Sequence, residues 1–146
     1  MERNLSMSQF LSKDDLKQAA DVQATTVADE LIAAEIARQG RMWGVERDDT
    51  TQGELQQAAF AQLDFLRRRQ RGDHDALVVA NFAYYPASWC GFRDYGSDVA
   101  NLVVAVAYLR NEIARKIRAG ESTERTSRNV VEQPYCELNQ PNVIEP

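Results

Sequence analysis

The chain has 146 residues, of which 44% are hydrophobic and 27% charged, and this length favours a single domain with one core of moderate size. With only seven glycines and four prolines, the composition argues against an all-β or a disordered chain. The net charge of −5 argues against a non-specific nucleic-acid binder, which needs a basic face. An acidic site that binds cations agrees better with this charge.

Cysteine usage and hydropathy indicate a reducing, aqueous compartment. The two cysteines, Cys90 and Cys136, have neither the partners of a disulfide framework nor the spacing of a zinc site. The N-terminus lacks a basic segment followed by an apolar one, and no apolar run approaches the length of about 18 residues that a membrane span requires. We therefore expect an intracellular, cytoplasmic protein with no membrane partner.

The first third of the chain carries two helix-start signals. Residues 1–11 lack periodicity and are expected to fray or to pack on a partner. Ser12 and Asp15 form one capping box, and Thr26 and Asp29 form a second one before an apolar stripe that ends at Gly40. The sequence thus predicts two helices in this region, or one long helix if the two segments fuse.

A third helix follows from the capping box of Thr51 and Glu54, and its 3.6-residue period runs to a basic cluster before Gly72. Residues 73–96 lose this period and collect aromatic side chains, so they are predicted to be irregular. Ser97 is predicted to cap a last long helix that ends at Gly120. Its apolar stripe consists of Leu102, Val103, Val106, Leu109, Ile113 and Ile117.

The fold class expected from these patterns is all-α, a helical bundle over residues 1–120 with an extended C-terminal tail at 121–146. The stripe of the last helix, together with the apolar positions of the other helices, is more apolar surface than a single chain of this size covers easily. Oligomerisation is therefore expected to complete the bundle, with the tail wrapping a neighbouring subunit.

Three acids fall near helix ends that can meet in an antiparallel bundle. Glu35 lies near the end of one predicted helix, Glu54 begins the next, and Asp98 begins the last, with Asn101 one turn further on. Clustered carboxylates repel one another unless a cation lies among them, and oxygen ligands select Mg²⁺ or Mn²⁺. The alternative for each acid is a helix cap or a solvated side chain.

The order of several motifs resembles the MazG-like nucleoside triphosphate pyrophosphohydrolases of phages, in particular their dATP/dGTP branch. The resemblance covers roughly residues 28–118. It is carried by Ala-Glu-Ile-Ala-Arg-Gln at 34–39, Trp43, Asp48-Asp49, Gly-Glu-Leu at 53–55 with Ala58-Ala59, Pro86, Trp89 and the segment 101–113.

This resemblance implies an all-α fold that assembles as a homodimer or homotetramer. It further implies an enzyme that cleaves a purine nucleoside triphosphate, dGTP or dATP, between its α and β phosphates, giving a monophosphate and pyrophosphate. The reaction would use two or three Mg²⁺ or Mn²⁺ ions per site, in the host cytoplasm if a phage encodes the chain.

The chain departs from the family at its acidic motifs. Thr50 and Thr51 stand where the first two glutamates of a Glu-Glu-x-x-Glu run are expected, and Asp98-x-x-Asn101 replaces a Glu-x-x-Asp pair. We expect Glu35, with Asp48 or Asp49, to replace the missing acids. Glu35 and Glu54 are thus the predicted catalytic residues. The predicted metal ligands are Glu35, Glu54, Asp98 and Asn101.

The remaining candidates would hold the substrate. Arginine forks match phosphate oxygens, and aromatic rings stack on a base. The predicted substrate-binding residues are Arg38, Gln39, Trp43, Asp48, Asp49, Trp89 and Arg93. The alternatives are a surface ion pair for Arg38 and core packing for the aromatics. A rival hypothesis for the whole chain is a helical oligomer that binds nucleotides without turnover, because the usual acids are missing.

Overall fold

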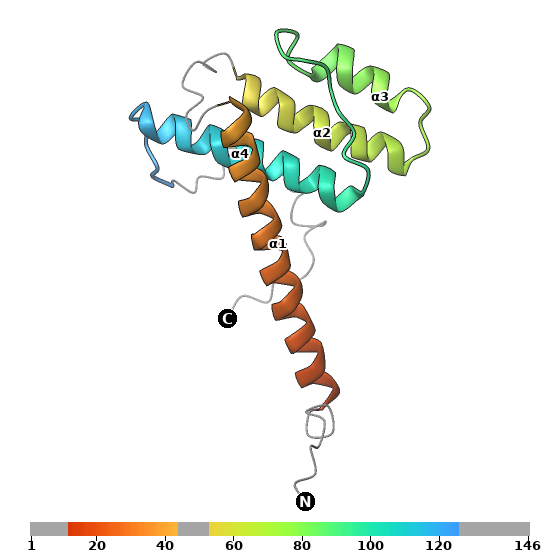
Figure 1. Ribbon diagram of the computed structural model, residues 1–146, viewed down its shortest axis with the longest axis vertical. Helices are drawn as coiled ribbons and strands as arrows, with labels where there is room; N and C mark the ends of the chain where they lie inside the picture. The colour runs from red at the N-terminus through yellow and green to blue at the C-terminus, as the bar shows by residue number, and fades with distance from the viewer. Residues whose placement is uncertain (1–11, 44–52, 126–146) are drawn as a thin grey trace, which may run out of the picture.

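The computed structural model describes residues 12–43 and 53–125, and these residues are all-helical, with no strand among them (Figure 1). The helices are α1 (Lys13–Trp43), α2 (Glu54–Gln70), the single turn α3 (Ala76–Val79), the π-helical turn η2 (Ala80–Tyr84) and α4 (Asp98–Arg118). The all-α prediction is confirmed in this respect. Within the described residues no helix is long and apolar enough to span a membrane.

The core lies between α2 and α4, which run antiparallel. At one end of the pair Arg69 of α2 contacts Asp98 of α4. Gln62, half-way along α2, contacts Asn101 near the start of α4. Toward the other end a buried cluster brings together Leu55, Ala58 and Ala59 of α2 with Val104 and Tyr108 of α4. Three aromatic side chains of the 85–95 segment, Tyr85, Trp89 and Tyr95, pack against this cluster and complete the core.

The segment α1 is one helix of 31 residues, so the fused alternative is the correct one. Its start agrees with the prediction, since the Asp15 amide donates to Ser12 Oγ at 3.1 Å. The second capping box is wrong, because the Thr26 hydroxyl donates to the Val22 carbonyl inside the helix. The predicted end at Gly40 is also wrong, since a single glycine costs a helix only about 1 kcal/mol and no proline follows.

Two further boundaries differ from the sequence analysis. The cap of α2 is Gly53, whose φ of +78° is a left-handed conformation that glycine adopts without strain, so the helix starts later than the Thr51 box predicted. Thr51 itself lies outside the described residues. The 73–96 segment is not wholly irregular, because α3 and η2 occupy residues 76–84. The Ser97 cap is confirmed by a 3.0 Å hydrogen bond from the Ala100 amide.

The helix α4 buries a face other than the predicted stripe. Asn101, Val104, Ala105, Tyr108 and Glu112 point inward, while the stripe residues are exposed except for half-buried Val103. Buried Glu112 is neutralised by Arg115, whose hydrogen bond lowers the pKa of the Glu112 carboxyl. The helix is apolar on two sides, so periodicity alone could not select the inward one.

Candidate functional site

An aromatic cavity of about 330 Å³ lies where the end of α1, the middle of α4 and the 85–95 segment meet. The principal residues that line it are Met42, Tyr85, Trp89, Arg93, Tyr95 and Tyr108. Tyr108 is buried at its wall, and burial raises the pKa of its phenol, which stays a neutral hydrogen-bonding group. Two predicted substrate residues, Trp89 and Arg93, therefore line one cavity.

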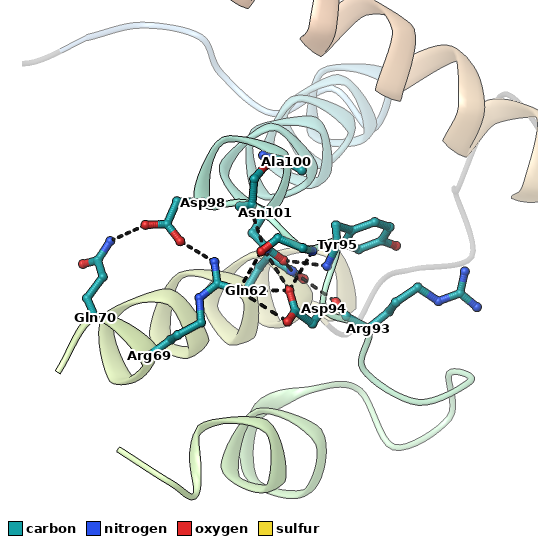
Figure 2. Close-up of polar contacts among 11 residues, drawn as sticks. Gln62, Arg69, Gln70, Arg93, Asp94, Tyr95, Asp98, Ala100 and Asn101 are labelled. Atoms are coloured by element: carbon teal, nitrogen blue, oxygen red, sulfur yellow. Dashed lines mark hydrogen bonds and ion pairs between the residues drawn. The ribbon is translucent and has the colours of Figure 1, made fainter. Parts of the chain in front are cut away.

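The cavity wall is held by ring contacts and by backbone hydrogen bonds. Trp89 packs edge-on against Tyr85, with ring centroids 5.7 Å apart, and lies 6.0 Å from the ring of Tyr108. The carbonyl of Arg93 accepts a hydrogen bond from buried Gln62 of α2 at 3.2 Å. This contact fixes the backbone of Arg93 while its side chain points away from the helices (Figure 2). The segment thus presents an indole and a guanidinium from a fixed backbone.

Glu35 and Arg38 form a bidentate ion pair next to this cavity. Arg38 donates from Nε and from an Nη to the two oxygens of Glu35, each at 2.7 Å. The guanidinium also lies 5.5 Å from the ring centroid of Tyr95 and donates to its hydroxyl at 3.3 Å. The hydrogen bond with Glu35 raises the pKa of Arg38 above its ordinary value. The ion-pair alternative for Arg38 is thus the arrangement observed, and the pair lies beside the candidate site.

Gln39 is buried and joins this pair to α4. Its amide nitrogen donates to Glu35 at 3.0 Å, and its oxygen accepts from Asn111 at 2.9 Å. Both ends of the amide are used within the chain. Gln39 therefore orients Glu35, a contact that the prediction of Gln39 as a substrate-binding residue did not include.

A second hollow, the α1–α4 groove, lies beside the same ion pair. It measures about 540 Å³, and the residues that line it include Leu31, Ala34, Glu35, Arg38, Tyr95, Val99 and Val103. Because Arg38 and Tyr95 line this groove and Tyr95 also lines the aromatic cavity, the two hollows share a wall.

Asn101 is a structural hub rather than an open ligand (Figure 2). It is 0% exposed, donates to Asp94 at 3.0 Å and to the Ser97 carbonyl at 2.8 Å, and accepts from Gln62 and from the Tyr95 amide. All of its hydrogen-bonding groups are therefore engaged. The prediction of Asn101 as a metal ligand is not supported by this arrangement.

Asp98 lies on the surface near this hub, in contact with α2. Arg69 bridges Asp98 and Asp94, and Gln70 donates to Asp98 at 3.3 Å. The hydrogen bond from Arg69 holds the pKa of Asp98 below its ordinary value. Burial raises the pKa of Asp94, but hydrogen bonds from the Gly96 amide, Asn101 and Arg69 outweigh it, so this pKa also lies below its ordinary value.

The predicted convergence of three acids is wrong within one chain. Arg69, the partner of Asp98, is fifteen residues along α2 from Glu54, which corresponds to about 22 Å of helix. Glu54 begins α2 next to Leu55, which belongs to the same buried cluster as Tyr108. The antiparallel packing of α2 and α4 thus places Asp98 and Glu54 at opposite ends of the pair.

Three of the predicted substrate-binding side chains lie outside the described part of the chain. Asp48 and Asp49 lie outside the described residues, and so does the side chain of Trp43 at the end of α1. In the part of the chain that is described, no three His, Cys, Asp or Glu side chains come together in a way that could hold a metal ion. Of the predicted metal ligands, Glu35 lies beside the cavity and Glu54 lies at the Tyr108 end of α2.

Several residues of the site were absent from the sequence analysis. Tyr108 occurs at the spacing of the inward face of α4, since Asn101, Val104, Tyr108 and Glu112 recur every three or four residues, and this signal was available. The contacts of Tyr95 with Arg38 and of Gln62 with Arg93 join segments far apart in the chain, so no local pattern indicates them. Comparisons with known proteins found no matching family model, curated protein or solved structure.

Proposed function

We propose that this chain is a MazG-like pyrophosphohydrolase that binds a purine nucleoside triphosphate, dGTP or dATP, and releases the monophosphate and pyrophosphate. The reaction would belong to nucleotide-pool metabolism in the cytoplasm, and the chain would act as a homodimer or homotetramer. Support comes from the ordered motifs at 34–39, 86–89 and 101–113, which contribute residues around the aromatic cavity.

The observation that carries this proposal is the pairing of an aromatic cavity with two arginines. Trp89 and the tyrosines offer faces on which a base stacks, and stacking is worth about 1–3 kcal/mol per base. Arg93 lines the same cavity, and Arg38 lies behind Tyr95. An apolar slot with guanidinium groups at its side suits a ligand that is planar at one end and anionic at the other.

The base would enter between Trp89 and the tyrosine rings, with its polar edge toward the tyrosine hydroxyls. The phosphates would extend toward Arg93 and Arg38. For Arg38 this means giving up its bidentate bond to Glu35, so nucleotide binding would exchange one carboxylate partner for a phosphate. Gln39 would keep Glu35 in place during that exchange, because it binds Glu35 independently of Arg38.

The metal requirement belongs to the proposal through the family resemblance. Bound Mg²⁺ or Mn²⁺ would supply charge neutralisation for the triphosphate and a more acidic water. Glu35 and Glu54 would take this role, and Asp48 and Asp49 are the predicted additions. Since the residues described form no group of three ligands, they do not make a multinuclear metal site by themselves.

The replacement of the usual acids by Thr50, Thr51 and Asn101 favours a second candidate function, a nucleotide-binding oligomer without turnover. Both candidates predict binding in the aromatic cavity, and only the first predicts products. The deciding experiment incubates the full chain with dGTP or dATP and Mg²⁺ or Mn²⁺ and separates the products. Monophosphate and pyrophosphate support the hydrolase, binding without products supports the second candidate, and neither binding nor products contradicts both.

A variant pair tests the base slot in the same preparation. Trp89→Ala should weaken nucleotide binding on the order of tenfold, since it removes one stacking face. Phe82→Ala is the matched control, because Phe82 is 81% exposed and lines a different surface hollow. Equal losses in both variants, or no loss in either, would contradict the assignment of the slot.

A further inference from the structure

The N-terminal part of α1, residues 13–31, projects away from the other helices as a stalk (Figure 1). Every residue of this stalk is exposed, and the first half-buried position of α1 is Ile32. Isolated helices are marginally stable in water, and the hydroxyls of Thr25 and Thr26 bond carbonyls one turn earlier, which does not strengthen a helix. A helix of this length needs a surface on which to pack.

The stalk has an apolar stripe with the spacing of a coiled coil. Ala20, Ala24, Val27 and Leu31 follow one another at steps of four, three and four residues. The stripe continues into the α1–α4 groove, because Leu31 lines that groove. Acids flank the stripe at the neighbouring heptad positions, notably Asp14, Asp21 and Glu30.

The outer face of α4 carries a matching seam. Val99, Leu102, Val106, Leu109 and Ile113 recur at alternating steps of three and four residues, and each is 39–59% exposed. The inner face of the same helix buries polar Asn101 and Glu112, whereas these five apolar side chains of α4 stay exposed. Extended apolar patches on a protein surface mark interaction sites. Val99 lines the α1–α4 groove too, so the seam and the stripe form one continuous surface.

We propose that the stalk of one copy packs antiparallel on the α4 seam of a second copy, and that the second copy receives the first one's stalk in return. The two elements match in length, since residues 13–31 and 99–117 each span about 28 Å of helix. In this register the alanines of the stalk face larger side chains: Ala24 faces Val106, and Ala20 faces Leu109. Small residues opposite large ones are what close interdigitation requires.

Charge selects the antiparallel direction. The stalk contains five acids and two lysines, whereas α4 from Arg110 to Arg118 contains four basic residues and one acid. Antiparallel packing places Asp21 beside Arg110 and Asp14 beside Lys116, whereas a parallel arrangement would move Asp14 to the acidic start of α4 at Asp98. A reciprocal exchange of stalks is also a closed two-fold assembly, which leaves no seam uncovered.

The assembly would complete the candidate site. The stalk leaves its own subunit at Leu31, beside the Glu35–Arg38 pair, and the seam of the same subunit starts in the same groove at Val99. An incoming stalk would therefore cover the groove side of that ion pair. This inference deepens the self-association in the proposed function and does not depend on nucleotide binding.

Cysteine cross-linking tests the register in the full chain. In a background with Cys90→Ser and Cys136→Ser, Ala24→Cys and Val106→Cys are made as separate variants, mixed, and oxidised. A disulfide-linked heterodimer is expected, with yield at least several-fold above that from either variant alone. Val22→Cys mixed with Val106→Cys is the matched control, because Val22 is 62% exposed on another face of the stalk and should give little product.

Charge exchange gives an independent measure of the same contact by light scattering. Asp21→Arg or Arg110→Asp alone should raise the dimer dissociation constant on the order of tenfold, and the double variant should restore it. Asp29→Arg, on the outer face of the stalk, should leave the dimer unchanged. A monomeric mass for the unmodified chain at micromolar concentration overturns the proposal. Efficient disulfide formation by Val106→Cys alone overturns it as well, since that result would place α4 against α4.

Discussion

Replacement of Asn101 by aspartate changes only the amide nitrogen to an oxygen. It therefore tests whether Asn101 is a structural hub or a metal ligand. The amide nitrogen of Asn101 donates to Asp94 and to the Ser97 carbonyl, and an aspartate at this position has no N–H to donate. The new carboxylate would also lie within hydrogen-bond distance of the Asp94 carboxylate, in a position with no exposure to solvent. Asn101→Asp should therefore destabilise the fold.

The magnitude follows from the new charge and from the contacts that are lost. Asp94 and the Ser97 carbonyl lie on exposed residues and keep other donors, so most of the cost falls on the new carboxylate itself. A buried charge without a cationic partner costs about 3–5 kcal/mol, and here it would lie beside a second carboxylate. We expect a loss of about 3–5 kcal/mol in the free energy of unfolding, which is a large share of the total for a domain of this size. Burial and the Asp94 charge raise the pKa of the new carboxyl, so the deficit should shrink as the pH falls and the group becomes neutral.

Urea unfolding followed by circular dichroism measures this loss, with and without Mg²⁺ or Mn²⁺. Asn81→Asp is the matched control: Asn81 accepts a hydrogen bond from the Phe92 amide through its carbonyl oxygen, which an aspartate retains. Its cost should stay below about 1 kcal/mol. A variant Asn101→Asp that is as stable as the unmodified chain in chelator, or that gains stability when metal is added, would refute the hub and restore the metal-ligand hypothesis.

Two further predictions concern the two ends of α2. Arg69→Gln removes the partner that lowers the pKa of two aspartates, so the variant should be less stable than the unmodified chain at about pH 7. This difference in stability, measured as the urea midpoint, should vanish as the pH falls through the folded-state pKa values of the two aspartates, below about 3.9. The control Arg67→Gln, at an exposed neighbouring position, should show no such pH-dependent difference. Glu54→Gln should lower the rate of pyrophosphate release by about 10²-fold or more, whereas Asp98→Asn should leave this rate within about twofold of the unmodified chain. The opposite order of effects would contradict the placement of the site.

The sequence correctly predicted two helix ends that depend only on neighbouring residues, the start of α4 and the end of α2. Ser97 caps α4 and the basic end of α2 precedes Gly72, because each signal acts within one turn of helix. The Thr26 capping box failed for the converse reason: a threonine hydroxyl also bonds a carbonyl one turn earlier, and no glycine or proline interrupted the helix there.

The site was predictable only where its contacts are local. The Glu35–Arg38 pair follows from their spacing of three residues. The amide contacts of Asn101 with Gln62 and of Gln39 with Asn111 span 39 and 72 residues, and they depend on how the helices pack. The predicted convergence of the acids depended on that packing. It is wrong because the antiparallel α2–α4 pair separates Glu54 from Asp98.

The most direct test of the central claim, that the aromatic cavity binds the nucleotide, is the alkylation rate of Cys90. This thiol is exposed and lines the cavity beside Trp89, and the Cys136→Ser variant leaves it as the single cysteine. Bound dGTP or dATP should slow its alkylation several-fold, while inorganic triphosphate, which lacks a base, should leave the rate nearly unchanged. An unchanged rate under saturating nucleotide would contradict the claim and place the binding site elsewhere on the chain.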